Sequence, residues 1–528
     1  MKKNILGCLC FLGYLKGTAQ ELQSFDQKIN TGFKNMTDWF VDAIFAEIPI
    51  TSEVGTPWVL VVLLMGASYF TIYFKGINFR SFWTSIRIIR GKYDALENSE
   101  ILEVSESVHT TDGDQPDTVR AEGEIGEVSH FQALTAALSA TVGLGNIAGV
   151  AIALSIGGAG ATFWMILVGF LGMASKFVEC TLGVAYREVT EDGTVYGGPM
   201  YYLSKGLREK GFSKLGKVLA AIFAIMCVGG SFGGGNMFQA NQAFKLFEHV
   251  TGAENSFFYG KGWLFGLIMA ILVAIVIIGG IKKIAKVTDK IVPAMVVVYV
   301  LAVITIIVIN YQIVPEAFMS IIDGAFSTKG VTGGMVGVMI QGFRRAAFSN
   351  EAGIGSASIA HAAVKTKYAA SEGLVALLEP FIDTVVICTM TALVLIITGQ
   401  INVGAEISDE QGVLLTANAL ESGISWFPYL LSFAVILFAF SSMISWSYYG
   451  YQAWSYLFGR KKYVSYIYKT IFCICVIIGS AASLNAVTDF SDAMIFSMLV
   501  PNMIGLFILT PKVATELRKY KKAIANSN

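Results

Sequence analysis

The sequence predicts an all-α, polytopic membrane protein with two five-helix halves of opposite orientation and one extra N-terminal helix. The chain has 528 residues, of which 54% are hydrophobic and 14% charged, and its mean hydropathy is +0.61. Soluble domains carry about 25% charged residues, so this composition indicates many membrane-spanning segments. Acidic and basic residues are balanced at 38 each, which argues against a nucleic-acid partner.

Eleven apolar stretches are long enough to cross the roughly 30 Å hydrocarbon core of a bilayer. They cover residues 57–74, 131–154, 160–184, 217–243, 262–280, 291–309, 334–361, 371–398, 427–457, 464–481 and 487–510. We interpret the first as an accessory helix, because the other ten divide into two repeats, 131–309 and 334–510. Residues 511–528 then form a cytoplasmic tail.

Three further segments flank these spans. Residues 1–19 begin with Lys2 and Lys3, continue with a short apolar run and end in small residues, a pattern typical of a signal peptide. An uncleaved amphipathic start is the alternative. Residues 20–56 are predicted to be an extracytoplasmic amphipathic segment, and residues 95–127 an acidic, solvated cytoplasmic loop.

The distribution of basic residues predicts the orientation of the spans. With the first span running inward, the inner segments hold 26 lysines and arginines and the outer segments hold 5. Basic residues concentrate in cytoplasmic loops. We therefore expect the N-terminus outside and the C-terminus in the cytoplasm.

Two spans contain a predicted break in the helix. Ala137–Gly149 reads ALSATVGLGNIAG, and Ala346–Ala360 reads AAFSNEAGIGSASIA, displaced by 210 positions. Glycine inside a helix costs roughly 1 kcal/mol relative to alanine, so each Gly-x-Gly pair favours an interruption. A break in lipid leaves peptide groups unpaired, which is tolerated only against protein or a wet cavity. The alternative is close packing of two unbroken helices.

Such paired breaks are typical of the binding site of a secondary transporter. The broken spans are the second and the seventh, and this odd offset of five gives the two repeats opposite orientations. Amide groups after a break favour a carboxylate, and exposed carbonyls favour an ammonium group or a small cation. For an amino acid, we expect the amides of Leu144 and Gly145 to meet the carboxylate. The carbonyls near Thr141 and Phe348, with the Ser349 hydroxyl, would meet the ammonium.

Three motifs resemble one family of membrane proteins. TVGLGNIAGVA at Thr141–Ala151, GGAGATFWM at Gly157–Met165 and FSNEAGIGSA at Phe348–Ala357 are similar to the alanine or glycine:cation symporter family. The resemblance implies a LeuT-like fold of the amino acid-polyamine-cation superfamily and symport of alanine or glycine with sodium. A proton-coupled small amino acid permease is the alternative. With the charge distribution, it also implies a bacterial cytoplasmic (inner) membrane protein.

The resemblance also implies a sodium site between the first and eighth core helices. Carried over by motif, its ligands are the carbonyls of Ser139, Val142 and Phe438 and the hydroxyls of Ser441 and Ser442. Oxygen ligands without a net carboxylate suit a monovalent cation. Serines in membrane helices also bond back to their own helix, which is the structural alternative.

The fourth span ends in GGSFGGGNMFQANQ, whose glycines allow close approach and whose Gln239 and Gln242 add hydrogen-bonding groups. Trp446 is expected to limit the substrate's side chain, with an interfacial position as the alternative. The candidate substrate-binding residues are Thr141, Gly143, Leu144, Gly145, Gln239, Gln242, Phe348, Ser349, Glu351, Gly353 and Trp446.

Ionisable residues inside spans are expected to pair with one another. For Arg344 and Arg345 we expect a buried network with the available carboxylates, and for Lys176 a pair with Glu179, three residues along the same helix. The carboxylates available to the arginines are Glu351, Glu379 and Asp383. The four histidines are scattered, so no catalytic residue is predicted. The expected partners are the amino acid, sodium and the bilayer, with no obligatory protein partner.

Overall fold

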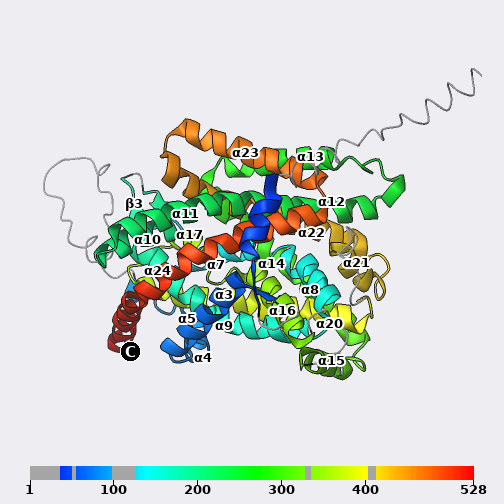
Figure 1. Ribbon diagram of the computed structural model, residues 1–528, viewed down its shortest axis with the longest axis horizontal. Helices are drawn as coiled ribbons and strands as arrows, with labels where there is room; N and C mark the ends of the chain where they lie inside the picture. The colour runs from blue at the N-terminus through cyan, green and yellow to red at the C-terminus, as the bar shows by residue number, and fades with distance from the viewer. Residues whose placement is uncertain are drawn as a thin grey trace, which may run out of the picture.

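The computed structural model describes residues 36–49, 55–97, 126–191, 193–326, 334–401 and 412–527. In these ranges the chain is mostly helical, and long helices lie beside one another through the bundle (Figure 1). The predicted all-α class is therefore confirmed. The predicted signal peptide (1–19) and most of the segments 20–56 and 95–127 lie outside the described residues.

The first half of the chain supplies an N-terminal group of helices and then the elements around the first break. The N-terminal group is α3 (Trp58–Tyr73), α4 (Ile77–Arg80) and α5 (Phe82–Ile89). The following elements are α7 (His130–Thr141), η1 (Gly145–Gly149), α8 (Val150–Gly157), α9 (Ala161–Ala185), α10 (Pro199–Glu209), α11 (Ser213–Phe232), η2 (Gly233–Met237), α12 (Phe238–Val250), η3 (Ala253–Asn255), α13 (Gly262–Ile277) and α14 (Gly280–Ile309).

The second half contains the second break and the C-terminal helices. Its elements are α15 (Val314–Phe326), α16 (Gly334–Asn350), α17 (Ala357–His361), α18 (Ala369–Ala376), α19 (Leu378–Pro380), η4 (Phe381–Cys388), α20 (Thr389–Ile397), α21 (Val413–Glu421), α22 (Phe427–Phe458), α23 (Lys462–Ala481) and α24 (Leu484–Ser527). Two short antiparallel strand pairs complete the described fold: β1 (Glu47–Pro49) with β2 (Gly55–Pro57), and β3 (Glu188–Val189) with β4 (Val195–Tyr196).

Several helices are long and apolar enough to cross a bilayer. The described residues contain seven such helices, or eight if one bent pair counts as a single span. The helices α11, η2 and α12 form one of them, a continuous helical stretch of 38 residues, and α3 and α13 are shorter apolar helices. The arrangement of ten spans in two repeats, with one accessory helix, stays a prediction.

The first predicted break is present. Helix α7 starts with a capping box between Ser129 and Gln132, which satisfies two backbone amides. It ends at Thr141, and the chain bends by 50° before continuing as η1 and α8. The amide of Gly143 donates to Oδ1 of Asn146 over 2.9 Å, so a side chain replaces the lost helical acceptor. This local pairing is what a break inside lipid requires.

The second predicted break separates α16 from α17. Glu351, Gly353 and Gly355 all have positive φ, at 54°, 84° and 98°. Left-handed backbone suits glycine, whereas for a glutamate it is strained by about 1–3 kcal/mol. A Cβ on Gly355 would also approach Pro199 Cγ to 2.7 Å. Conformation and packing both require glycine here, and a strained residue such as this glutamate is typical of functional segments.

Two π-helical segments lie within otherwise α-helical spans. η2 interrupts the span formed by α11 and α12, and η4 lies between α19 and α20. Single π-turns are frequent at functional sites. η4 contacts η1 and α16, and so flanks both broken helices, whereas η2 packs against α22 and α24.

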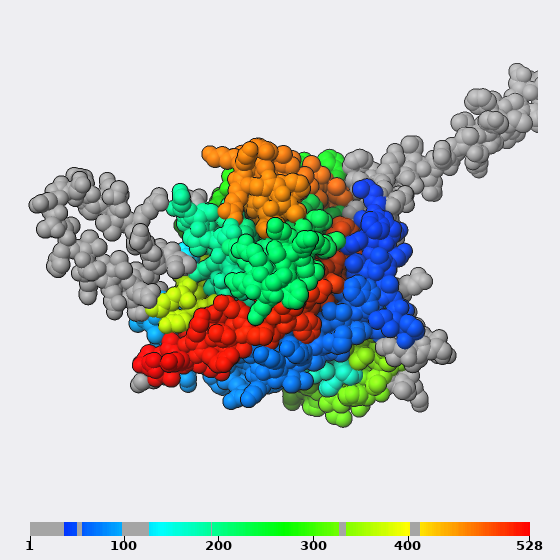
Figure 2. Space-filling view, turned by 60° about the vertical axis from the view of Figure 1, so that its left-hand side comes forward, coloured from blue at the N-terminus to red at the C-terminus, as the bar shows by residue number. Residues whose placement is uncertain are grey.

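The C-terminal helix covers one side of the bundle. Figure 2 shows this red segment crossing the visible face, with the blue N-terminal region beside it. Its contacts with α3 include Phe507, whose ring lies 5.1 Å from that of Tyr69 between centroids. α24 extends to Ser527, so the predicted tail 511–528 continues the last helix through all its described residues.

A chain of buried polar residues joins the start of α7 to other helices. His130 contacts Glu97 at 2.9 Å through Nε2 and Glu372 through Nδ1, and the other carboxylate oxygen of Glu372 lies 2.5 Å from His361. Tyr520 donates to Glu97 over 2.8 Å, which adds α24 to the chain. Two of the four histidines thus meet around one glutamate, a clustering that their positions in the sequence did not indicate.

A partly exposed cluster of ion pairs lies at the segment between α9 and α10. Glu188 lies 2.7 Å from Arg460 and 3.0 Å from Lys205. Burial alone would raise the pKa of Glu188, but the hydrogen bonds from these two cations outweigh burial and hold it below its usual value. The carboxylate therefore stays ionised to lower pH than an isolated glutamate.

Candidate functional site

The two breaks lie against each other. Asn146 in η1 donates from Nδ2 to Oγ of Ser349 in α16 over 3.1 Å. A Cβ on Gly145 would stand 3.6 Å from Cδ1 of Phe348 and from Cα of Ser349, which is ordinary contact. The chain segments predicted to be interrupted therefore meet, although 203 positions separate Asn146 from Ser349.

A small buried cavity lies at this meeting point. Its accessible space is about 10 Å³, which is room for about one water molecule. Its lining residues are Ala140, Thr141, Gly145, Gly234, Gln239, Phe348, Glu351, Trp446 and Ile495. Six of the predicted substrate-binding residues are among them. The broken helices contribute polar groups, whereas α22 and α24 contribute Trp446 and Ile495 as apolar walls.

Five predicted substrate-binding residues do not line the cavity. Of these, Leu144 and Ser349 are next in sequence to residues that do, and Gly143 precedes Leu144. Gln242 accepts from the amide of Val413 over 2.9 Å and so joins α12 to α21. The carbonyl of Gly353 accepts from Asn502 over 2.8 Å, which joins the second break to α24.

Glu351 is the carboxylate of the cavity. It is 2% exposed, and its Oε1 accepts from Nε1 of Trp446 over 3.1 Å. Its Oε2 accepts from the hydroxyl of Ser356, within the same break. Both oxygens have a partner, so the side chain is fixed in one orientation at the cavity wall.

Gln239 connects the first break to η2. Its Oε1 accepts from the amide of Leu144 over 3.2 Å, and its Nε2 donates to the carbonyl of Gly234 over 3.0 Å. The Leu144 amide, expected to face the substrate, therefore has a protein partner in this structure. The side chain that takes its place at the cavity is Gln239.

A polar cluster whose contacts sequence reasoning did not predict lies behind the cavity. Asp383 in η4 accepts from Asn146 over 2.6 Å and from Ser349 over 2.8 Å, and so touches both broken helices. Asp383 is fully buried. A carboxylate within an apolar span is the signal that could have identified it, since such residues are rare and usually functional.

The predicted cation ligands converge from α7 and α22. Ser442 donates to the carbonyl of Ser139 over 3.0 Å, and Ser139 donates to the carbonyl of Ser441 over 2.8 Å. The hydroxyl of Ser441 donates to the carbonyl of Phe438 over 3.0 Å. Val142, the remaining predicted ligand, caps α7 at the break.

Glycine at the first break makes room for these hydroxyls. A Cβ on Gly143 would approach Oγ of Ser442 to 2.5 Å, which is too close for any side chain. The break therefore leaves a cradle of carbonyl and hydroxyl oxygens. Such neutral oxygen ligands fit a small monovalent cation.

The arginines of α16 pair differently from the prediction. Arg344 contacts Asp492 at 2.7 Å through Nε, and Arg345 contacts the same carboxylate. The predicted partners, Glu351, Glu379 and Asp383, form no ion pair with either arginine among the described residues. That prediction was wrong, because the first turns of α24 pack beside α16 and bring Asp492 there.

The predicted pair of Lys176 with Glu179 is present but is not the closest contact. Nζ of Lys176 lies 3.9 Å from Glu179 and 3.1 Å from Glu379 in α19. All three side chains are fully buried. The lysine therefore joins α9 to α19 rather than bridging only its own helix.

Two broken helices that meet at a buried polar cavity define a secondary transporter. Residues 40–528 match the model of the sodium:alanine symporter family. The chain belongs to this family, which confirms the resemblance carried by its three motifs. It is accordingly a transporter rather than an enzyme.

The relatives AgcS and AlsT agree with this assignment. The sodium/alanine symporter AgcS of Methanococcus maripaludis is 40% identical over 402 residues, which cover 76% of this chain and 86% of AgcS. The amino-acid carrier protein AlsT of Bacillus subtilis is 32% identical, with 90% and 92% of the two chains covered. The solved structure of MhsT in complex with L-phenylalanine aligns with a TM-score of 0.48 and 16% identity, covering 74% of this chain and all of that one.

Proposed function

We propose that this protein is a secondary active transporter that takes up alanine, glycine or both together with sodium by alternating access. The observation that carries this proposal is the small cavity between the two broken helices, lined by peptide groups, Glu351 and Trp446. Family membership and the printed function of AgcS support the choice of sodium and alanine. They do not favour the proton-coupled alternative.

In this proposal the cavity selects a small zwitterion. The amide of Gly145 and the amide side chain of Gln239 meet the substrate carboxylate. The carbonyl of Thr141, with the carboxylate of Glu351, meets its ammonium group. The walls must move apart to admit an amino acid, and the bulk of Trp446 and Phe348 then limits its side chain to a hydrogen or a methyl group.

The cation site in this proposal is the oxygen cradle between α7 and α22. The carbonyls of Ser139, Val142 and Phe438 and the hydroxyls of Ser441 and Ser442 are its ligands. The two serine hydroxyls rotate to direct lone pairs at the ion. The close approach of Ser442 to Gly143 supports this assignment, because only glycine leaves that space open.

In this proposal sodium and substrate binding are coupled because the cation site and the substrate site share the first break. Ser139 and Val142 precede Gly143, and Leu144 and Gly145 follow it, so one short segment serves both ligands. An ion that fixes this segment also fixes the peptide groups that meet the substrate. Linked binding of this kind commonly amounts to 1–3 kcal/mol, and each ligand strengthens the other equally.

We also propose that the protein lies in the bacterial cytoplasmic membrane with its N-terminus outside and its C-terminus inside. The distribution of basic residues supports this orientation. Membrane-impermeant labelling of single cysteines placed at Lys214 and Lys261 tests it. Labelling from outside at position 261 alone is expected, and labelling at position 214 alone would reverse the orientation.

Tracer uptake into proteoliposomes tests the function. We expect labelled alanine to accumulate under an inward sodium gradient, and not under an equal potassium gradient or in protein-free vesicles. Accumulation driven by a pH gradient without sodium would overturn sodium coupling. Unlabelled alanine and glycine should compete, whereas leucine and glutamine should not, since Trp446 and Phe348 leave little room for a longer side chain. Glutamine belongs in this panel because the relative GlnT of Bacillus subtilis, 31% identical, is described as a probable sodium/glutamine symporter.

A further inference from the structure

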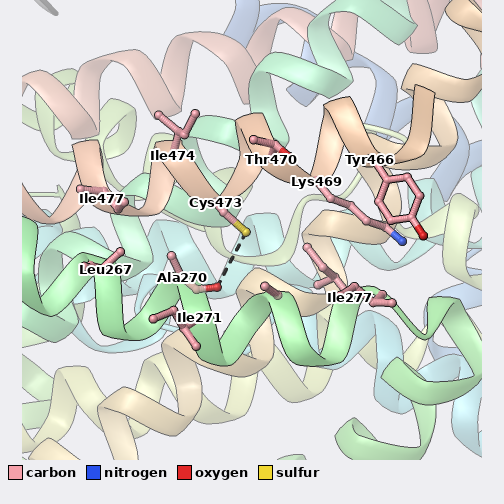
Figure 3. Close-up of a pocket in the computed structure, with 12 residues that line it drawn as sticks. Leu267, Ala270, Ile271, Ile277, Tyr466, Lys469, Thr470, Cys473, Ile474 and Ile477 are labelled. Carbon is pink, nitrogen blue, oxygen red and sulfur yellow. Dashed lines mark hydrogen bonds between the residues drawn. The ribbon is translucent and has the colours of Figure 1, made fainter. Parts of the chain in front are cut away.

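A second hollow lies on the outside of the bundle, between α13 and α23. It has about 350 Å³ of accessible space and is lined mostly by aliphatic side chains of these two helices (Figure 3). Ile271 and Ile474 on its rim are 56% and 49% exposed. Both helices lie at the edge of the molecule in Figure 1, so this groove faces the surroundings rather than the substrate cavity.

Unequal packing of the two helices creates the groove. Near the start of α13, a Cβ on Gly262 would approach the carbonyl of Ser480 to 2.2 Å, and one on Gly266 would approach Ile477 to 2.8 Å. Glycines thus bring the helices together at one end. Towards the other end Ile277 and Lys469 line the groove.

Lys469 is the one charged residue that lines this groove. It is half-buried, and its ammonium lies 5.7 Å from the ring centroid of Tyr451. Within the described part of the chain no carboxylate forms an ion pair with it. An unpaired lysine in a spanning helix is costly, so an anion from outside the protein is the natural complement.

The depth of Lys469 suits the headgroup of a lipid. It follows the first residue of α23, Lys462, by seven positions, which places it about 10 Å along the helix. A lysine at that depth can extend towards the interface. Tyr466 and Thr470 flank it and supply hydroxyl groups at the same end of the groove (Figure 3).

We propose that the groove between α13 and α23 binds one anionic glycerophospholipid. Its phosphate pairs with the ammonium of Lys469 and accepts hydrogen bonds from Tyr466 and Thr470. One acyl chain lies along the aliphatic wall formed by Ile271 and Ile474. Basic pockets between spanning helices recognise anionic headgroups in this way. The proposal does not depend on the identity of the transported substrate.

Lipid retention by the purified full-length protein tests the proposal. Native mass spectrometry would count lipids retained from mixed micelles that contain phosphatidylglycerol or phosphatidylcholine with the same acyl chains. The wild-type protein should retain one phosphatidylglycerol with about fivefold preference, since one lysine near an anionic surface contributes about 1 kcal/mol. Equal retention of the two lipids would overturn the proposal.

Two variants and one control locate the site. Lys469→Gln should abolish the headgroup preference, whereas Lys462→Gln, an exposed change on the same helix, should preserve it. Ile271→Trp should fill the groove and reduce retention of both lipids. Unfolding temperatures confirm that each variant is folded. A Lys469→Gln protein that still prefers phosphatidylglycerol, or an Ile271→Trp protein that retains it fully, would refute the site.

Discussion

The hydrogen bond from Trp446 to Glu351 makes the sharpest prediction. Trp446→Phe keeps an aromatic ring in the cavity wall but removes the Nε1–H that donates to the carboxylate over 3.1 Å. Both side chains are buried, so water cannot replace the donor. A hydrogen bond to a charged group contributes about 1.5–3 kcal/mol. If this bond positions Glu351 for the substrate, alanine binding should weaken about 10- to 150-fold.

Equilibrium binding of labelled alanine in saturating sodium measures this change. Trp454→Phe is the matched control, because its Nε1 also donates over 3.1 Å from the same helix but to the carbonyl of Val464. That variant should bind alanine as the wild type does. A double-mutant cycle with Glu351→Gln should show strong coupling to Trp446. Wild-type affinity in Trp446→Phe, or equal losses in the two tryptophan variants, would refute the assigned role of this bond.

Three further predictions concern packing, the cation and pH. Gly235→Ala should lower the unfolding temperature and abolish alanine binding, because its Cβ would approach the cavity tryptophan to 2.1 Å; Gly145→Ala, with contacts at 3.6 Å, should keep the wild-type unfolding temperature. Ser442→Ala should raise the sodium concentration for half-maximal uptake by about 2- to 12-fold, as expected for one lost oxygen contact. Ser447→Ala, whose hydroxyl donates only to the carbonyl three residues back in its own helix, should leave that concentration unchanged. Glu188→Gln should reduce stability near neutral pH by less than about 1 kcal/mol, since the pair is partly exposed. Because the folded pKa of this carboxylate is lowered, its contribution is present above the unfolded pKa of 4.5 and is lost as the pH falls through the folded value. Unfolding temperatures of the two proteins should therefore converge in acid, and a constant difference would contradict the ion pair.

The positions of the two breaks could be predicted because their causes are local. Gly353 and Gly355 adopt positive φ, which few other residues tolerate, and their spacing repeats that of Gly143 and Gly145. The polar residues around each pair follow from the same requirement, since the freed peptide groups need partners. Local backbone chemistry was therefore enough to place the candidate cavity along the chain.

The choice of partners could not be predicted because it depends on packing between distant helices. Asp492 lies 148 positions from Arg344, and Asp383 lies 237 positions from Asn146. Sequence reasoning found the charges but assigned Asp383 to the arginines, which the fold places elsewhere. His130 and His361 likewise meet only because Glu372 stands between them.

The dependence of alanine affinity on sodium tests the central claim most directly. The claim is that one interrupted helix serves both ligands, so that binding of the ion prepares the peptide groups that meet the amino acid. The dissociation constant for alanine, measured on the purified protein in sodium and in choline at equal ionic strength, should be about 5- to 150-fold lower in sodium. The same dissociation constant in both salts would contradict the account.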